Sequence, residues 1–262
     1  MEVIQSRDNC TIKEIKKLKD KKSRLEHNKF LVEGFRFVSE ALESSFEVTD
    51  VFISESQLQK WNDFFMNEKL QTDTKIYLVK DSILNSICST NTPQGIIAVV
   101  KNKKLNIEDR NGFYILADKV QDPGNMGTII RTADAAGALG IITSAGTVDI
   151  YNEKTLRSTM GSIFKIPIIE DKDFNVIHEL KNKGFKLIVS SLDSKQNYFS
   201  IDLCGKMIIA VGNEGSGVSS EVKALSDINV KIPMPGNAES LNVAIAAGVM
   251  MFEAVRQITA VD

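Results

Sequence analysis

Long uninterrupted apolar runs in the second half of the chain constrain its fold most. FYILADKV, FKLIVSSL and KMIIAVG are apolar over most of their length, and segments with helical periodicity separate them. Strands that are buried on both faces have such continuous runs, whereas half-exposed strands alternate apolar and polar residues. The pattern therefore predicts an α/β fold whose parallel sheet is covered by helices on both faces.

Three loops rich in glycine and asparagine follow apolar runs in the same half. They are QDPGNMGTIIRTA (Gln121–Ala133), GNEGSG (Gly212–Gly217) and IPMPGNAESLNVA (Ile232–Ala244). Glycine lets the backbone approach a ligand closely, while proline and asparagine fix turns. Because ligands bind beyond the carboxyl ends of strands in parallel sheets, the three loops predict one composite pocket.

The first hundred residues predict a smaller α/β domain. Ile12, Ile15 and Leu18 recur at helical spacing in a lysine-rich helix, and FLVEG, VFI, IYLV and GIIAVV have the composition of strands. The stretch Lys101–Gly112 is polar and charged, as interdomain linkers are. We therefore expect a first domain over 1–102, a linker over 103–112 and a second domain over 113–262.

Helices are expected between the strands of both domains. The first domain is expected to have helices near Phe35–Leu42, Gln57–Glu68 and Ile83–Cys88. The second is expected to have them at Gly127–Ala138, Glu153–Ser162, Phe174–Lys183 and from about Leu241. Asn125 and Ser240 stand just before two of these helices and are expected N-caps.

Charge and cysteine content exclude several classes of protein. The net charge of -2 gives no overall attraction to nucleic acid, but lysine and arginine outnumber acids between Ile12 and Arg36. Cys10, Cys88 and Cys204 have no CxxC spacing, so neither a disulfide framework nor a metal site is predicted. The N-terminus has no apolar signal core. A cytoplasmic protein without a membrane segment is the expectation.

Two familiar nucleotide-binding signatures are missing from the sequence. GNEGSG does not match G-x-G-x-x-G, and no GxxxxGK[ST] motif occurs anywhere in the chain. Neither a dinucleotide-binding Rossmann domain nor a P-loop is therefore predicted.

Taken together, the motifs resemble the SpoU family of RNA ribose 2′-O-methyltransferases, in the SPOUT superfamily. The resemblance is carried by Asn125 with Gly127, Arg131 and Ala133, then by GNEGSG, and then by IPM with SLNVA. TLRSTMGSIFKIPI (Thr155–Ile168) is similar to the family as well. FLVEG and TPQGIIAVV resemble a substrate-binding domain that is often fused to such enzymes and is related to ribosomal RNA-binding proteins.

The resemblance implies an α/β SPOUT domain ending in a trefoil knot, preceded by an RNA-binding domain and assembled as a homodimer. It implies S-adenosylmethionine as the methyl donor, with no metal and no membrane partner. The matching cofactor-binding positions are Gly212, Asn213, Gly215, Ile232, Met234 and Leu241. The matching catalytic positions are Asn125, Arg131, Glu214, Ser240 and Asn242.

The resemblance leaves the substrate open between several RNA-related readings. Ribosomal RNA is the first expectation because of the appended domain, and transfer RNA is the second. A catalytically idle RNA-binding or ribosome-assembly protein is the alternative from another class. An enzyme that acts on a different nucleotide ligand through the same loops is a further alternative.

Each catalytic candidate has a structural alternative. Arg131 is a poor base because the guanidinium pKa exceeds about 12, so we expect it to position a phosphate and stabilise developing alkoxide charge. Its alternative is an exposed arginine paired with Asp134. Glu214 either organises a cationic sulfonium and Arg131 or is an acid at a helix start.

Other residues carry weaker signals. The lysine-rich helix is either a solvated face or a phosphate contact, and Arg157 is a further candidate for the RNA path. His27 and His178 are expected at the surface, whereas Trp61 is expected to anchor a small core rather than to stack on a base.

Overall fold

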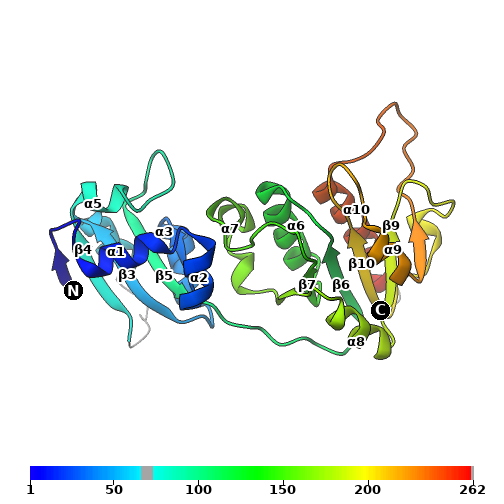
Figure 1. Ribbon diagram of the computed structural model, residues 1–262, viewed down its shortest axis with the longest axis horizontal. Coiled ribbons are helices and arrows are strands. Elements are labelled where there is room, and N and C mark those ends of the chain that lie inside the picture. Colours follow the sequence, from blue (N-terminus) through cyan, green and yellow to red (C-terminus); the bar gives the residue numbers. More distant parts are fainter. Residues whose placement is uncertain (66–72, 261–262) are drawn as a thin grey trace. The chain divides into compact units, whose positions relative to one another are not determined.

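The computed structural model describes residues 1–65 and 73–260. The chain divides into two compact units, one of Met1–Lys103 with Tyr151–Leu156 and one of Lys104–Ile150 with Arg157–Asp262. Helices and strands alternate in both units, and the elements can be followed by their labels in Figure 1. The predicted α/β class is confirmed.

The first unit has a mixed five-stranded sheet. Its order is β1 (Glu2–Ile4), β4 (Lys75–Val79), β3 (Val48–Ser54), β5 (Ile96–Lys101) and β2 (Lys29–Glu33). The β1, β4 and β3 strands are parallel, whereas β5 runs antiparallel to both of its neighbours. The predicted strands FLVEG, VFI, IYLV and GIIAVV fall on β2, β3, β4 and β5.

Both faces of this sheet are covered. Apolar side chains of α1 (Cys10–Lys17) and α5 (Asp81–Asn85) pack with Phe52 and Tyr77 on one face. The α3 helix (Phe35–Glu43) contacts β2 and β5. The α4 helix (Leu58–Phe65) contacts β3 and the short helix η1 (Glu55–Gln57). Trp61 is 5% exposed and is a core anchor, as predicted. The end of the helix predicted to reach Glu68 lies outside the described residues.

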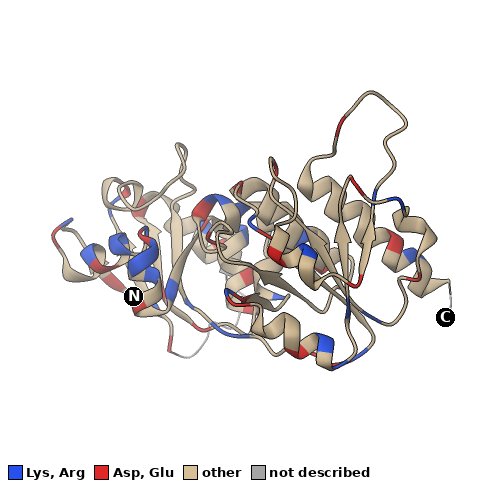
Figure 2. Ribbon diagram, turned by 45° about the vertical axis from the view of Figure 1, so that its right-hand side comes forward, with Lys and Arg blue, Asp and Glu red and all other residues tan. Residues whose placement is uncertain are grey.

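The predicted lysine-rich helix is two helices, α1 and α2 (Lys21–His27). The Asp20 side chain accepts a hydrogen bond from the Ser23 amide, so the chain starts a new helix there. Arg24 is buried, and its Nη1 atom donates to the carbonyls of Leu18 and Lys19. Arg24 therefore supports the break between the helices. The other basic residues lie along α1 and α2, and Figure 2 colours Lys and Arg positions blue.

The second unit has a six-stranded sheet in which every strand is parallel to its neighbours. Its order is β11 (Ile228–Val230), β9 (Lys186–Ser190), β10 (Lys206–Val211), β6 (Gly112–Ala117), β7 (Gly140–Thr143) and β8 (Ile168–Glu170). This confirms the parallel sheet that the continuous apolar runs predict. The β11 strand is shorter than the apolar stretch INVKIPM, because Ile232 and the residues after it form a loop.

Alternate residues of the buried strands face opposite helix layers. Phe113, Ile115 and Ile209 pack with apolar residues of α6 (Pro123–Ala135) and α10 (Val243–Thr259). Tyr114 and Ile208 point the other way, toward α8 (Asn175–Asn182) and α9 (Ser220–Leu225). The remaining elements of this unit are η2 (Ser162–Phe164) and η3 (Tyr198–Ser200), and α7 (Glu153–Thr159) is divided between the two units after Leu156. Helices cover both faces, as expected.

Two helices begin at other residues than predicted. The α6 helix begins at Pro123, and Asp122 is its N-cap, so the expectation that Asn125 caps it is wrong. The α10 helix begins at Val243, and its N-cap is Asn242 rather than Ser240. Proline at the first helical position and an aspartate before it make the earlier start of α6 favourable. The shift leaves the Asn125 side chain free of capping and available for other contacts.

In the described part of the chain, no helix is long and apolar enough to cross a membrane.

Candidate functional site

The three predicted loops converge at the carboxyl ends of the strands of the second sheet. The chain runs outward from β6 through β7 to β8, and then crosses to β9 and β10 on the other side of β6. The reversal at the border of β6 and β10 makes a switch point, where α/β sheets bind ligands. A cavity of about 290 Å³ lies beside it and is bordered by the 212–217 loop, residues 190–193 and the start of α10.

The GNEGSG loop closes on itself. The backbones of Asn213 and Gly217 exchange two hydrogen bonds of 2.9 Å. The Asn213 Oδ1 atom accepts from the amides of Gly215 and Ser216, and its Nδ2 atom donates to the Lys119 carbonyl at 3.0 Å. A Cβ atom on Gly212 would lie 2.1 Å from the carbonyl carbon of Gly217. Only glycine at position 212 allows this closure.

Side chains from all three loops form one hydrogen-bonded chain. Asn242 Nδ2 donates to Asn125 Oδ1 at 2.9 Å, and Asn125 Nδ2 donates to Glu214 Oε1 at 2.9 Å. The capping role of Asn242 sets the direction, because its Oδ1 atom accepts from the amides of Ala244 and Ile245. At the other end, an ionised carboxylate can only accept. We call Asn242, Asn125 and Glu214 the amide relay.

Glu214 is surrounded by donors. Its carboxylate also accepts from the backbone amides of Gln121 and Asp122, at 3.3 and 3.2 Å. Burial acts to raise the pKa of Glu214, but the hydrogen bonds from Asn125 and from backbone amides outweigh it, so the pKa lies below the ordinary value of 4.5. Glu214 is therefore a fixed negative charge at neutral pH.

A buried carboxylate that the sequence analysis did not select joins the segment after β7 to the residue that caps α9. Asp118 follows β6 and is fully buried. Its Oδ1 atom accepts from the Ser144 hydroxyl and its Oδ2 atom from the Ser219 amide, both at 2.7 Å. Ser219 in turn caps α9 directly after the GNEGSG loop. An aspartate that ends an otherwise apolar run, in FYILAD, is the signal that could have identified it.

The structure brings the predicted cofactor-binding residues to the wall of one cavity. All six line it: Gly212, Asn213, Gly215, Ile232, Met234 and Leu241. Of the predicted catalytic residues, Glu214 and Ser240 line it too, and Asn125 and Asn242 reach it through the amide relay. Further lining residues that the sequence analysis missed are Ser190 at the end of β9, Ser191, Leu192 and Asp193 after it, and Lys223 in α9.

Arg131 lies apart from the cavity wall. It is exposed on α6, six residues beyond Asn125 along the same helix. Within residues 1–65 and 73–260 its guanidinium has neither an ion pair nor a side-chain hydrogen bond, so the alternative of a pair with Asp134 is not seen. The guanidinium is available to an external anion. Arg157 is likewise exposed, near the end of α7.

His27 and His178 are exposed, as expected for histidines without partners at ligand spacing. Among the described residues, no three or more His, Cys, Asp or Glu side chains are grouped so that they could hold a metal ion.

The cavity has the chemistry that S-adenosylmethionine requires. Ile232, Met234 and Leu241 offer apolar surface for a planar ring, and the GNEGSG backbone offers amides and carbonyls at close range. Glu214 and Asp193 place carboxylates on the wall, where they favour a positively charged ligand. The residues present therefore fit this cofactor.

Comparison with known proteins agrees with both folds. The SpoU rRNA Methylase family matches residues 112–252, and the MRM3-like substrate binding domain matches residues 9–98. The chain is 37% identical over 254 residues to the 23S rRNA (guanosine(2553)-2′-O)-methyltransferase RlmP of Bacillus subtilis, covering 96% of this chain and 98% of that one. It is 31% identical to the 23S rRNA (uridine(2479)-2′-O)-methyltransferase of Streptomyces viridochromogenes, covering 92% and 87%.

Solved structures have the same fold over nearly the whole chain. The AdoMet-bound rRNA methyltransferase from Sinorhizobium meliloti has a TM-score of 0.84 and 32% identity, with 97% of both chains covered. The SpoU methyltransferase AviRb from Streptomyces viridochromogenes, in complex with AdoMet, has a TM-score of 0.87 and 30% identity, with 95% and 98% covered.

The fold, the glycine-rich cavity and these matches define the class: an RNA methyltransferase with an N-terminal substrate-binding domain. More specifically, the chain belongs to the SpoU rRNA Methylase family.

Proposed function

We propose that this protein transfers the methyl group of S-adenosylmethionine to the ribose 2′-hydroxyl of a nucleotide in 23S rRNA. The observation that carries the proposal is the amide relay, which ties the three family loops together beside one cavity lined by all six predicted cofactor contacts. Two relatives that match most of the chain are described as 23S rRNA 2′-O-methyltransferases. Transfer RNA is the alternative, since the A. aeolicus TrmH/SpoU tRNA modifying enzyme is 31% identical over a match that covers 56% of this chain.

The chemistry sets three demands on the protein. S-adenosylmethionine supplies an electrophilic methyl group on a cationic sulfur. The protein must hold the 2′-oxygen in line with that methyl carbon, receive or pass on the hydroxyl proton, and keep the site poor in water.

Glu214 and the amide relay favour binding of the positively charged cofactor. The carboxylate is ionised at neutral pH and is held in place by three donors, so it presents a fixed negative charge to a cationic ligand. Asn125 and Asn242 fix its orientation because each amide has only one orientation that satisfies both of its neighbours. Ser240 is exposed on the cavity wall. In this proposal its hydroxyl contacts the ribose.

Arg131 acts on the RNA rather than as a base. Its guanidinium is always protonated near neutral pH, and it is exposed and unpaired in the described structure. It holds a substrate phosphate in a bidentate contact and stabilises negative charge that develops on the 2′-oxygen. The phosphate or a water molecule receives the proton.

The first unit supplies RNA affinity in this proposal, with 1–102 as the RNA-binding domain and 103–112 as the linker. Basic residues of α1 and α2 support it, because contacts with phosphates dominate the affinity for RNA. Removal of the residues before Lys101 should lower both the RNA affinity and its dependence on salt. An unchanged affinity and salt slope would contradict this assignment.

The active form in this proposal is a cytoplasmic homodimer. Ile245 and Phe252 support a dimer contact, because they are 54% and 51% exposed and lie two turns apart on α10. Three free cysteines agree with a reducing compartment. Light scattering tests the assembly, and a mass near the 29.0 kDa of one chain would contradict it.

The end of the chain is threaded into a trefoil knot in this proposal. The strand order supports it, since the chain leaves the sheet edge at β11 and returns to pack α10 against α6 and β10. A crystal structure tests it by the path traced between Lys206 and Ala260. An unthreaded path would contradict the knot without touching the assigned activity.

Transfer of labelled methyl to RNA from cells that lack this gene tests the proposed activity. Nucleoside mass spectrometry should find a new 2′-O-methylnucleoside in 23S rRNA, and Arg131→Ala should abolish it. A methylated base would retain the cofactor and overturn the ribose chemistry. Absence of both cofactor binding and transfer would favour the idle RNA-binding protein.

A further inference from the structure

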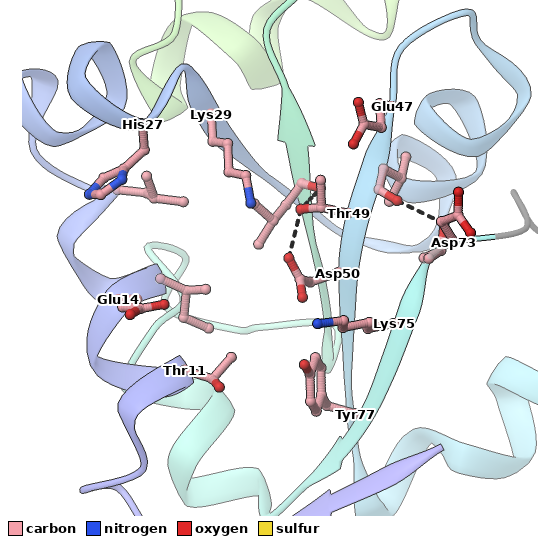
Figure 3. Close-up of a pocket in the computed structure, with 15 residues that line it drawn as sticks. Thr11, Glu14, His27, Lys29, Glu47, Thr49, Asp50, Asp73, Lys75 and Tyr77 are labelled. Carbon is pink, nitrogen blue, oxygen red and sulfur yellow. Dashed lines mark hydrogen bonds between the residues drawn. The ribbon is translucent and has the colours of Figure 1, made fainter.

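A second cleft lies within the first unit, where α1 and α2 border one face of the sheet (Figure 3). It encloses about 580 Å³. Ligand sites in proteins have volumes of about 300–1,000 Å³, so the cleft is large enough for a small molecule or one nucleotide. The side chains that line the cleft indicate which kind of ligand it binds.

Charged residues occupy positions on this sheet face where core residues are expected. Phe52 and Tyr77 are register partners on β3 and β4, and their rings stack at 4.8 Å. Asp50 and Lys75 form the register pair two residues earlier on the same two strands, and therefore lie on the same face. A sheet face covered by a helix excludes charges unless they have partners, so this pair marks the point where α1 no longer covers the sheet.

These charges have few partners within the protein. Asp50 accepts a hydrogen bond from the Thr49 hydroxyl at 2.6 Å but forms no ion pair with Lys75 in the part of the chain that the structure describes. Lys29 and Lys75 form no ion pair or side-chain hydrogen bond within those residues either. Figure 3 shows the side chains of Lys29, Asp50 and Lys75 around one opening. A ligand with both an anionic group and a hydrogen-bond donor would pair with the two lysines and with Asp50.

The floor of the cleft is apolar. Ile15 of α1 and its C-cap Leu18 face it from one side, and Val99 and Tyr77 of the sheet face it from the other. All four are at most 6% exposed, so the apolar surface that they offer to the cleft is a narrow slot. Such a slot accepts the face of a planar ring, while the charged groups contact the edge of the ring and its anionic substituent.

A nucleotide whose base carries an exocyclic amino group meets all three conditions. A phosphate satisfies Lys29 and Lys75, and carboxylates accept hydrogen bonds from amino groups of bases. Uracil fits less well, because its only N–H donor on the pairing edge lies between two carbonyl oxygens that a carboxylate repels. Proteins that read RNA by sequence bind unstacked bases in this way.

We propose that this cleft binds one unstacked adenosine, cytidine or guanosine nucleotide of the RNA substrate. Asp50 accepts from the amino group of the base, and Lys29 and Lys75 contact its phosphate. The identity of the RNA rests on the proposed function, whereas the nucleotide chemistry of the cleft rests on its own residues.

Methyl-detected NMR of the full chain tests the nucleotide chemistry. The methyl groups of Ile15, Leu18 and Val99 report on the cleft, and those of Ile232 and Leu241 report on the cavity of the second unit. AMP, CMP or GMP at millimolar concentration should shift the first set, with UMP bound about tenfold more weakly. Asp50→Asn should remove the preference over UMP, and Lys75→Met should weaken the binding of all four.

Two exposed residues outside the cleft provide matched controls. Asp63→Asn and Lys80→Met make the same chemical changes on the same unit and should leave the shifts unaltered. Cleft methyl groups that stay unmoved with all four nucleotides would overturn the proposal, whatever the methyltransferase activity. Equal binding of UMP would overturn the reading of Asp50.

Steady-state methylation of 23S rRNA separates RNA from a free nucleotide as the source. Asp50→Asn should raise KM for the RNA about tenfold while kcat and S-adenosylmethionine affinity are unchanged. Nucleotide shifts together with an unchanged KM would overturn the assignment to the RNA substrate. Nucleotide shifts in a protein that methylates no RNA would support the cleft chemistry and count against the proposed activity alone.

Discussion

Asn242 and Asn125 lie 117 residues apart in the sequence, and the Nδ2 atom of the first donates to the Oδ1 atom of the second at 2.9 Å. The same Asn242 side chain caps α10 through its Oδ1 atom. The start of the last helix is thereby connected to Glu214 through Asn125. The helix cap and the carboxylate at the cavity wall are parts of one network. Asn242 uses Oδ1 for the cap and Nδ2 for the relay, so a substitution can remove one role and keep the other.

Asn242→Asp should separate these two roles. Aspartate caps helices as well as asparagine does, so the melting temperature should change little. It cannot donate to Asn125, and its charge repels the Asn125 Oδ1 atom, so kcat should fall by about 100-fold. Thermal unfolding and methyl transfer measure the two effects. Asn242→Ala is the comparison and should also lose about 1 kcal/mol of stability. Full activity of the aspartate variant would show that the relay is not needed.

Glu214 should make the stability of the protein depend on pH only under acidic conditions. Because its folded pKa lies below the ordinary value of 4.5, its contribution is complete above pH 4.5 and is lost as the pH falls through the lowered folded pKa. The melting temperature of the wild type minus that of Glu214→Gln should therefore be constant near neutral pH and shrink below pH 4.5. A difference that shrinks between about pH 6 and 8 would indicate a raised pKa instead.

Arg131→Lys should be nearly as inactive as Arg131→Ala. The planar fork of the guanidinium makes two parallel hydrogen bonds that an ammonium cannot reproduce, and loss of such stabilisation costs about 10²–10³ in kcat. Stability should change by less than about 0.5 kcal/mol, because the side chain is exposed. Initial rates with saturating RNA provide the measurement. A largely active lysine variant would argue that charge alone suffices.

Asp118→Asn should weaken both the fold and cofactor binding. The amide can still accept from the Ser219 amide, but its NH₂ group would then face the Ser144 hydroxyl, which would have to accept instead of donate. Rearranging these buried hydrogen bonds costs about 1–3 kcal/mol. Calorimetry should find a lower melting temperature and weaker S-adenosylmethionine binding. Ser144→Ala removes one donor to Asp118 and the acceptor of the Lys119 amide but keeps the Ser219 contact, so it should weaken cofactor binding less. An equal loss of binding would contradict this account.

Gly212→Ala should open the GNEGSG loop. The added methyl group would lie 2.1 Å from the backbone of Gly217, so the loop must move, and such overpacking costs about 1–3 kcal/mol. Cofactor binding, measured by isothermal titration, should fall steeply. Gly236→Ala is the control, because a Cβ atom there meets nothing within 4 Å. Unaltered binding in Gly212→Ala would mean that the loop adapts without loss.

Local patterns in the sequence predicted the secondary structure well but misplaced the starts of two helices. The continuous apolar runs predicted the parallel sheet, since burial on both faces leaves no polar alternation. The starts of α6 and α10 were wrong because several residues before each helix are good N-caps, and packing selects among them. The Asn125 side chain consequently took part in the amide relay, which no local pattern shows.

The charged residues of the first unit illustrate the same limit. Arg24 counted as part of a basic surface in the sequence, yet it is buried and binds two backbone carbonyls. No motif in the sequence singles out Asp50 or Lys75. Only the register of β3 and β4 places them side by side on one face. Spacing along one strand cannot reveal which residue of another strand lies opposite.

The sequence by itself determined the α/β class, the order of the apolar strands and the three loops whose motifs carry the SpoU resemblance. These are local features, because strand burial and turn chemistry leave their mark within a few residues. Only the tertiary structure decided that Asn242, Asn125 and Glu214 form one chain of hydrogen bonds and that Asp118 anchors α9. Those contacts join residues about a hundred positions apart, and their geometry exists only once the sheet has brought the carboxyl ends of its strands together.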